Sequence, residues 1–277
     1  MREALDRLVA GWALIIDAPP IETFAGLVVF VHRHGKPAVL KIHGPRSDEQ
    51  RSADVLAHYA GNGAVRLLER DPAGLLIERA TPGTEPTSLV RAGEDDRATE
   101  VIADTIAALH AAPGPVAGLP TVGDLGRGFE RYRQGNGDLR LDPSLVARAE
   151  GFYADLAASQ ADPVVLHGDL HHYNILRDAS RGWLAIDPKG ITGEPAYEVG
   201  ASLRNPIEDP ALFARPAIIA RRIAIHAERL GHDPQRMTAW CFAQAVLSAL
   251  WAIEDGTDPA AGIACAEAAL PLLSATS

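Results

Sequence analysis

The stretch of residues 164–190 most constrains the fold of this chain, because polar residues of catalytic type alternate there with short apolar runs. It reads VVLHGDLHHYNILRDASRGWLAIDPKG, and the runs VVL, NIL and WLAI are typical of short buried strands. Asp169 follows the first run, Asn174 begins the second, and Asp187 follows the third. Side chains at the ends of neighbouring strands can converge on one point. The stretch therefore predicts a small group of strands that presents two acids and an amide to a ligand.

Two carboxylates and an amide at this spacing suit a magnesium nucleotide. Mg²⁺ binds through one or two carboxylates together with substrate phosphates. In such a site Asp169 orients an acceptor hydroxyl and takes its proton, while Asn174 and Asp187 hold the metal on the phosphates. A lysine from elsewhere must bind the phosphates, and Lys41 ends the apolar run AVLKI as the strand lysine of a kinase does.

The histidines of the same stretch raise the alternative of a transition-metal site. His167 and His171 are four residues apart, as ligands on one face of a helix would be, but the flanking β runs are incompatible with that helix. The chain contains no HExxH motif. We interpret His171 and His172 as hydrogen-bonded loop residues, with contact to substrate as the alternative.

Residues 1–80 are predicted to form a mainly antiparallel sheet with one inserted helix. Two pairs of β runs are separated by polar turns, and a helix-compatible polar segment lies between the pairs. The β runs are residues 26–31, 37–42, 64–70 and 74–80. The segment TPGTEPTS then breaks the pattern, so we place a lobe boundary after residue 80.

Residues 81–277 are predicted to form a larger, mainly helical lobe. Between residues 94 and 112 the apolar residues recur with helical periodicity, and acids occupy the first turn. Further helices are predicted at 143–160, 210–230, 234–254 and 258–273. Together with the first lobe this is an α+β fold of two lobes.

The composition narrows the class of partner. The formal net charge is -10 and the pI is near 5.4, which argues against nucleic acid and favours a cationic small molecule. Cys241 and Cys265 lie in apolar segments that are predicted to be helical, and they are interpreted as small core residues. The N-terminus lacks the features of an export signal, and we expect no stretch of 18 uncharged apolar residues that would cross a membrane. We therefore expect a cytoplasmic protein.

The segments VLHGDLHHYNIL, IDPKG and AVLKI together resemble the aminoglycoside phosphotransferase family. Within that family, GNGAVRLLERD, LLIERATPG, DPKGITGEPAYEVGASLRNP and VLSALWAIEDG resemble the streptomycin 6-kinase and hydroxyurea phosphotransferase branch. The resemblance covers residues 23–256 approximately. It implies a bilobal protein-kinase-like fold, ATP or GTP with Mg²⁺ as cofactors, and transfer of a γ-phosphate to a hydroxyl. A streptomycin-type aminoglycoside is the favoured acceptor, and hydroxyurea, a sugar or another metabolite is the alternative.

The resemblance also implies residue roles. Asp169 would be the catalytic base supported by His167, Asn174 and Asp187 would bind magnesium, and Lys41 would hold the ATP phosphates. Backbone groups of the segment Glu78, Arg79 and Ala80 would face adenine.

Other positions depart from the family's pattern or have no assigned role. Only Gly26 stands where many kinases have a glycine-rich loop. Glu49 is the proposed ion-pair partner of Lys41, with a solvated helix residue as the alternative. Glu198 stands where relatives often have Asp, and Lys189 has a position beside the metal ligand without an assigned role.

The segment WAIEDGTDP suggests a second contact with the acceptor. Glu254 and Asp255 end a helix whose dipole they oppose, so a cation-binding rim is one interpretation and a plain helix end is the other. Trp251 is interpreted as core, with a substrate wall as the alternative. A non-catalytic protein that sequesters nucleotide or drug would be expected to lack one of Lys41, Asp169, Asn174 or Asp187, and all four are present.

Overall fold

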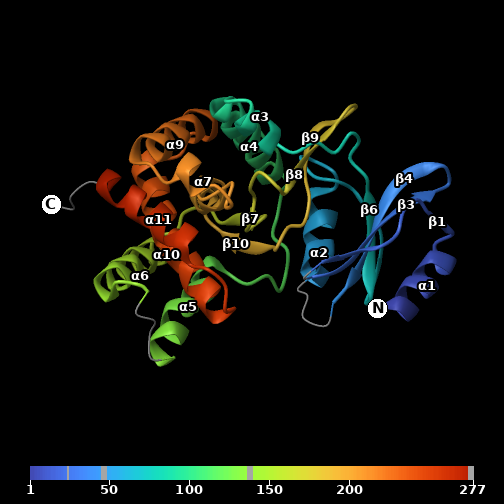
Figure 1. Cartoon of the computed structure of the whole chain (residues 1–277), viewed down its shortest axis with the longest axis horizontal. Coiled ribbons are helices and arrows are strands. Elements are labelled where there is room, and N and C mark those ends of the chain that lie inside the picture. The colour runs from blue at the N-terminus through green and yellow to red at the C-terminus, as the bar shows by residue number, and fades with distance from the viewer. Residues whose placement is uncertain (24, 45–48, 136–139, 274–277) are drawn as a thin grey trace.

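The computed structural model of the chain describes residues 1–273 apart from 24, 45–48 and 136–139, and the side chains of residues 49 and 50 also lie outside the described part. The chain folds into a β lobe followed by a helical lobe (Figure 1). This arrangement confirms the expected α+β fold. The predicted lobe boundary after residue 80 lies between the last strand of the sheet, which ends at Glu78, and the next helix, which begins at Thr87.

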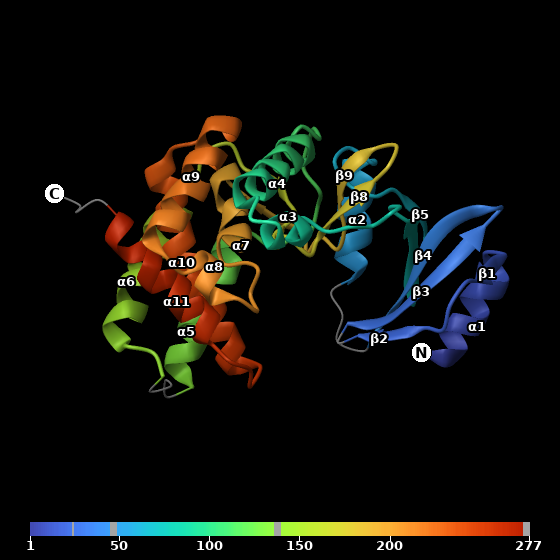
Figure 2. The same cartoon turned by 45° about the horizontal axis from the view of Figure 1, so that its top comes forward.

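The β lobe is one antiparallel sheet, which Figure 2 shows from the side. Along the sheet the strand order is β1-β3-β4-β6-β5, and β2 also pairs with β3. The strands are β1 (Leu14–Ile16), β2 (Ile21–Thr23), β3 (Gly26–Arg33), β4 (Lys36–His43), β5 (Leu67–Asp71) and β6 (Gly74–Glu78). Two helices belong to this lobe, α1 (Arg2–Gly11) and the inserted α2 (Glu49–Tyr59). The sequence predicted β3 to β6 and α2 but not α1, β1 or β2.

Alternation along β4 decides which way Lys41 faces. Leu40 and Ile42 are at most 1% exposed and pack with the residues of α1 on the outer face of the sheet. Because successive strand residues point to opposite faces, Lys41 lies on the inner face, toward the helical lobe. The sequence pattern thus places one cation at the junction of the two lobes.

The helical lobe surrounds two small antiparallel strand pairs. One pair is β7 (Val164–Leu166) with β10 (Ile191–Gly193), and the other is β8 (Ile175–Asp178) with β9 (Gly182–Ala185). These strands carry the motif read from the sequence, although β10 was not predicted. The helices are α3 (Thr87–Arg91), α4 (Asp95–His110), α5 (Val122–Gln134), α6 (Pro143–Ala158), α7 (Gly200–Leu203), α8 (Pro210–Phe213), α9 (Pro216–Leu230), α10 (Pro234–Glu254) and α11 (Ala260–Ala269).

The predicted helix over residues 210–230 is in fact two helices, α8 and α9. Arg215 between them is extended, with φ -132° and ψ 130°, and Pro216 opens α9. A proline disfavours helical geometry in the residue before it, which accounts for the break.

The expectation that no segment approaches the length and apolarity of a membrane span is wrong for α10. By length and composition alone this helix could cross a membrane. However, 72% of its apolar window is buried inside the protein, where it packs against α6 and α11 (Figure 1). The apolar run is the central core helix of the second lobe.

Candidate active site

The loop after β7 is anchored by a buried carboxylate. The backbone N–H groups of His167 and Gly168 donate to the two oxygens of Glu198, at 2.7 and 2.9 Å. Glu198 is 1% exposed. Gly168 has φ +83°, a left-handed conformation that glycine adopts without strain. The glutamate therefore holds the two N–H groups at the start of the loop, and the glycine lets the chain turn toward Asp169.

His167 ties this loop to the segment that carries Asp187. Its Nε2 donates to the carbonyl of Ile186 at 2.7 Å, and its own carbonyl accepts from the N–H of Lys189 at 2.9 Å. With Nε2 protonated, Nδ1 is free to accept from the N–H of Asp169, which lies 3.3 Å away. His167 is fully buried, so it acts as a support for the loop.

The carboxylate of Asp169 lies among cations. Lys189 Nζ is 3.0 Å from Oδ2, and an Arg204 nitrogen is 3.9 Å from Oδ1. Burial opposes ionisation of Asp169, but the positive charges outweigh it and hold the pKa well below its usual range. Burial also lowers the pKa of the neighbouring His171 to about 4, so that histidine is neutral near pH 7. Asp169 is therefore an ionised acceptor for a proton.

Asn174 and Asp187 lie on the other side of this loop. The amide nitrogen of Asn174 donates to the carbonyl of Asp169 at 2.9 Å, which leaves its Oδ1 to bind a ligand. Asp187 has φ +58°, in the left-handed region, and its Oδ1 accepts from Lys41 Nζ at 2.6 Å. Backbone in this region is costly for a non-glycine residue, and such conformations concentrate at functional sites. The structure thus joins the predicted lysine of β4 directly to a predicted metal ligand.

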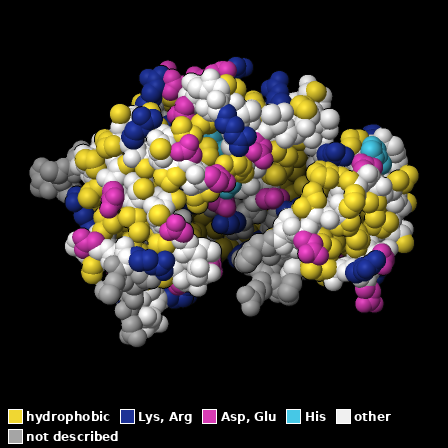
Figure 3. All heavy atoms as spheres, viewed as in Figure 1, with side chains coloured by type: hydrophobic (Ala, Val, Ile, Leu, Met, Phe, Trp, Pro, Cys, Tyr) yellow, Lys and Arg dark blue, Asp and Glu magenta, His cyan; other side chains and the backbone are white. Residues whose placement is uncertain are grey.

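A cavity of about 370 Å³ lies beside this ion pair, between the lobes. Its walls include Lys41 and Asp187, apolar side chains of β3, β4 and β6, and the segment 78–80. Figure 3 shows the surface hollowed between the lobes, with acidic, basic and histidine side chains gathered there. The carboxylate of Glu78 already accepts from Arg66 and Arg181, so its side chain is occupied. An apolar slot with a cation at its end suits a nucleotide base and its phosphates.

A second cavity, of about 310 Å³, adjoins the first one at Tyr173. It is lined by residues of α3, by Tyr173 and by the loop between α7 and α8, including Glu208 and Asp209. The Tyr173 hydroxyl donates to Glu208; burial and this contact raise the pKa of Tyr173 to about 12. The wall of this second space thus carries two acids and one base, Arg91 of α3, and it borders the loop after β7.

The two remaining loop histidines differ from each other. His171 accepts from the N–H of Tyr173 at 3.2 Å and lies 3.8 Å from Asp169, as a loop residue next to the substrate would. His172 is 1% exposed, and neither ring nitrogen has a hydrogen-bond partner among the described residues. The interpretation of His172 as a hydrogen-bonded loop residue is therefore wrong, and the ring is a neutral part of the core.

Several predicted site residues lie elsewhere or outside the described part. Glu254 forms a two-pronged ion pair with Arg131 of α5, at 3.0 and 3.2 Å, so a protein cation already occupies it. Asp255 is the exposed C-cap of α10, and Trp251 is half-buried against α5. Glu49 begins α2, but its side chain lies outside the described residues.

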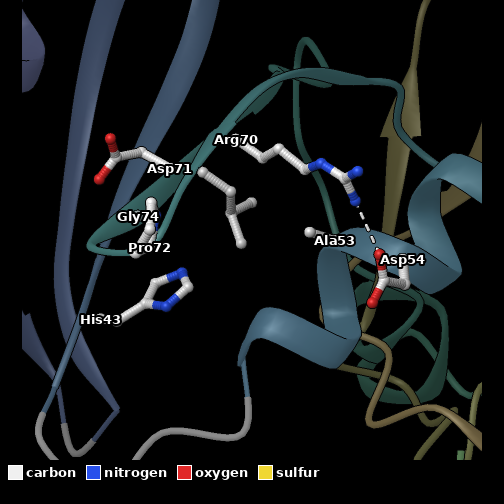
Figure 4. A pocket seen from close by; sticks show the side chains of 8 residues that line it. His43, Ala53, Asp54, Arg70, Asp71, Pro72 and Gly74 are labelled. Carbon is white, nitrogen blue, oxygen red and sulfur yellow. Dashed lines mark hydrogen bonds and ion pairs between the residues drawn. The ribbon is translucent and has the colours of Figure 1, made fainter. Parts of the chain in front are cut away.

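The β lobe carries a further cavity of about 300 Å³, between α2 and the turn joining β5 and β6. Figure 4 shows Arg70 reaching across it to Asp54, an ion pair of 2.7 Å. None of the residues that line it was predicted to bind nucleotide, metal or acceptor, so the cavity between the lobes remains the candidate site.

Comparisons with known proteins identify the family. A family model described as "Aminoglycoside/hydroxyurea antibiotic resistance kinase" matches residues 11–256. A streptomycin 3''-kinase from Klebsiella pneumoniae is 33% identical over 248 residues, which are 88% of this chain and 91% of that protein. The chain belongs to the aminoglycoside/hydroxyurea antibiotic resistance kinases. It is accordingly a phosphotransferase with a hydroxyl group as acceptor, as the resemblance implied.

Other similar members of the family cover most of the chain as well. A streptomycin 6-kinase from Streptomyces glaucescens is 33% identical over 94% of this chain and 85% of its own length. A hydroxyurea phosphotransferase from Kitasatospora aureofaciens is 32% identical over 88% of this chain and 71% of its own. The names of these relatives differ in the acceptor, which is streptomycin or hydroxyurea, and in the position phosphorylated on streptomycin, which is 3'' or 6.

Solved structures share the fold at low sequence identity. The aminoglycoside phosphotransferase APH(4)-Ia, solved with AMP-PNP and hygromycin B, aligns over the whole of both chains with a TM-score of 0.70 and 17% identity. The choline kinase LicA from Streptococcus pneumoniae aligns with a TM-score of 0.66 and 14% identity over 98% of this chain and 97% of its own. The kinase-like fold of this chain is therefore shown by sequence and by structure.

Sequence reasoning missed Tyr173, Arg204 and the acidic pair Glu208 and Asp209. Tyr173 lies inside the motif HGDLHHYN, between two residues that were assigned roles, and that position was the available signal. The other three lie in LRNPIEDP, where charged residues adjoin a buried helix end. Only the fold shows that this segment returns to the catalytic loop.

Proposed function

We propose that this protein transfers the γ-phosphoryl group of ATP to a hydroxyl of streptomycin or a closely related aminoglycoside. The observation that carries the proposal is the position of Asp169. Its ionised carboxylate belongs to the loop after β7, and Tyr173 of the same loop lines both the apolar cavity with Lys41 and the cavity with Glu208 and Asp209. A base on a loop shared by a nucleotide site and a cation site suits the phosphorylation of an aminoglycoside. Because ATP is the donor, we also expect the protein in the cytoplasm.

The donor set at Asn174 and Asp187 fits Mg²⁺, since both offer oxygen atoms of the kind this hard cation binds. These two residues would hold the metal, which neutralises phosphate charge when bound. Lys41 contacts Asp187 at 2.6 Å and lies at the cavity, where it can bind nucleotide phosphates. GTP carries the same phosphates as ATP, so both nucleotides are tested as phosphoryl donors.

Asp169 carries out the proton transfer in this proposal. The acceptor hydroxyl donates a hydrogen bond to the carboxylate, its oxygen attacks the γ-phosphorus, and its proton moves to Asp169. The bond between the γ-phosphorus and the bridging oxygen breaks, and ADP leaves with the electron pair. Positioning and charge neutralisation account for most of the rate enhancement in such a reaction.

Glu208 and Asp209 are proposed to bind the cationic groups of the acceptor. Both are exposed and line the cavity beyond Tyr173. A planar guanidinium pairs with a carboxylate through two parallel hydrogen bonds, and aminoglycosides of the streptomycin type carry such groups. These two residues replace Glu254, whose carboxylate is occupied by Arg131, as the expected cation site.

An acceptor screen tests the proposed function. ADP release is measured with streptomycin, other aminoglycosides, hydroxyurea and simple amino sugars, and the product mass must increase by one phosphate. Since the similar relatives include a 3''-kinase and 6-kinases, NMR of the product identifies the hydroxyl. Turnover of hydroxyurea without turnover of any aminoglycoside would favour the second candidate function, which the hydroxyurea phosphotransferase relative supports.

Kinetics of variants test the cation site. Glu208→Gln and Asp209→Asn together should raise the KM for streptomycin about tenfold or more, because the acceptor loses its ion pairs. The KM for ATP should change by less than about twofold, because the glutamine can still accept from the Tyr173 hydroxyl. Glu254→Gln is the matched control and should change neither constant. A larger effect at Glu254 would return the cation site to the end of α10.

A further inference from the structure

Lysine is rare in this chain and is concentrated at the site. Of 26 lysines and arginines only three are lysines. Lys36 is exposed at the start of β4, whereas Lys41 and Lys189 each contact one of the two site aspartates. Apart from Lys36, all the other positively charged side chains among these 26 are arginines, so an ammonium group is distinctive at these two positions. The role of Lys41 follows from its cavity, and that of Lys189 has not been accounted for.

The backbone of Lys189 is fixed by hydrogen bonds, whereas its side chain is exposed to solvent. Its N–H and that of Gly190 both donate to the carbonyl of His167, at 2.9 and 3.1 Å. Its ammonium lies 3.0 Å from Asp169 Oδ2, yet the side chain is 60% exposed. An ammonium has three N–H donors, so the contact with Asp169 leaves others for a ligand.

We propose that Lys189 binds the γ-phosphoryl group during transfer while it remains next to Asp169. This inference rests on the proposed function, in which the acceptor oxygen that gives its proton to Asp169 attacks the γ-phosphorus. A cation 3.0 Å from that carboxylate lies within reach of the phosphoryl oxygens as the acceptor bond forms and the bond to ADP breaks. Lys189 adds no atom and takes no proton. It offsets the negative charge that gathers on the phosphoryl oxygens and the base.

Two physical arguments favour this role over a plain surface ion pair. An exposed ion pair adds little to stability, so stability alone does not account for the contact. A guanidinium would bind the carboxylate through two hydrogen bonds and hold it, whereas an ammonium is a compact charge that two partners can share. Lysine therefore fits a position between the base and the phosphoryl group.

Amine labelling tests the contact directly, because the chain has three lysines to follow. The protein is treated briefly with acetic anhydride in the presence of Mg²⁺ and either AMP-PNP or ADP, each at saturation, and modification is measured by mass spectrometry. Lys189 should be protected at least fivefold by AMP-PNP and not by ADP. Lys41 should be protected by both nucleotides, and Lys36, the internal control, by neither.

The labelling outcomes separate this inference from the proposed function. Equal labelling of Lys189 with AMP-PNP and with ADP overturns the contact with the γ-phosphoryl group, even if Lys41 is protected. If neither AMP-PNP nor ADP protects Lys41, the proposed nucleotide site is overturned. The role proposed for Lys189 is then overturned as well.

A variant gives a second, independent measurement. Lys189→Met should weaken AMP-PNP binding about tenfold without changing ADP binding, and should lower kcat about 100-fold, the order expected when one donor to transition-state charge is removed. Lys36→Met, the matched control, should change none of these quantities. A parallel loss of ADP and AMP-PNP affinity would indicate a structural role and overturn the inference.

Discussion

Asp169 combines two properties that oppose each other in most side chains: it is largely enclosed, and it stays ionised. Enclosure disfavours its charged form, and the ammonium of Lys189 and the guanidinium of Arg204 restore it. A carboxylate in this state can accept a proton without first losing one. The same two cations sit where the negative charge of a phosphoryl group would arrive.

The first prediction concerns this base. Asp169→Asn keeps the size of the side chain and removes its proton acceptor, so kcat should fall by roughly 100-fold to 10,000-fold. The KM for ATP should stay within about twofold, because the nucleotide cavity is not altered. Steady-state kinetics with streptomycin measure both constants, and Asp155→Asn on the exposed face of α6 is the control. Unchanged turnover would leave a protein that binds its ligands without this base.

A second prediction concerns stability in acid. His226 is fully buried, with Nε2 3.2 Å from the Ser202 hydroxyl, and burial lowers its pKa to about 3. His172 is also buried, and its pKa likewise lies well below the usual value. When the pH falls below about 6.5, the unfolded chain binds protons that the folded chain does not, so stability decreases. At pH 5.5 the loss is about 1.4 kcal/mol for each such histidine.

Urea unfolding at pH 7.5 and pH 5.5 measures this loss. His226→Gln can still bond to Ser202 and has no titratable group, so its free energy of unfolding should change less between the two pH values than that of the wild type. The other titrating groups are the same in both proteins and cancel in the comparison. An equal pH dependence would mean that His226 does not remain neutral in the folded state.

At the scale of elements, two adjacent arginines attach α9 to α4 in different ways. Arg222 is 1% exposed; it contacts Asp95 and also donates to the carbonyls of Ser202 and Asn205, at 3.2 and 2.7 Å. Arg221 contacts Asp96 at the surface, and its side chain is 63% exposed. The buried arginine therefore connects α9 to the turn after α7, which carries Arg204.

A third prediction compares the two arginines. Arg222→Met leaves an acid and two carbonyl groups without their partner, and should lower the free energy of unfolding by about 3 kcal/mol. Arg221→Met should cost much less, as expected for an exposed ion pair. Denaturant unfolding of the two variants measures the difference. Similar losses would contradict the distinction between the buried and the exposed pair.

The contrast between these arginines shows where sequence reasoning succeeds and where it stops. Asp169, Asn174, Asp187 and Lys41 were predicted as a group because phosphate chemistry demands those residue types in that order. Arg221 and Arg222 are adjacent and identical residues, so the sequence does not distinguish them. Only the packing of α9 on α4 decides which one is buried. The role of Glu254 likewise depended on Arg131, a residue of a helix that was not predicted.

That helix, α5, was missed for a physical reason. Its sequence VGDLGRGFERYRQ contains three glycines, which lower helix propensity. Two of them serve packing: a Cβ at Gly126 would lie 2.7 Å from Tyr153, and one at Gly128 would lie 2.6 Å from Leu247. The capping box of Thr121 and Asp124 was the signal that could have revealed the helix. Close packing between helices cannot be recognised until the partner helix is known.

At the scale of the whole molecule, several polar contacts join the lobes, among them backbone hydrogen bonds of Val65 and Gly63 with Ala185. Two of the side-chain contacts differ in their relation to the site. Lys41 of the sheet meets Asp187 of the helical lobe, and Arg181 of the β8–β9 turn donates to Glu78 and to the carbonyl of Gly61. The first contact involves groups proposed to bind nucleotide and metal, so binding has to rearrange it. The second contact involves no such group and can persist.

A fourth prediction follows for metal and nucleotide removal. Lys41 and Asp187 would hold AMP-PNP with Mg²⁺, and at 100 times its Kd this ligand should stabilise the protein by about 2.7 kcal/mol. EDTA should remove most of this stabilisation. Asp187→Asn, which tolerates the left-handed backbone of this position better than alanine, should fold normally and show no effect of Mg²⁺. Thermal unfolding with and without each ligand measures these effects, and a full Mg²⁺ effect in the variant would exclude Asp187 as a ligand.

Tyr173 gives the two cavities a common wall. Its ring lines the space beside Lys41 and also the space beside Asp209, and its hydroxyl bonds to Glu208. A cation held by Glu208 and Asp209 and a nucleotide held beside Lys41 would lie against the same ring. If either ligand moves that ring, the two substrates are thermodynamically linked, and each alters the affinity of the other by the same factor. An affinity measured for either substrate alone would then differ from its affinity in the ternary complex.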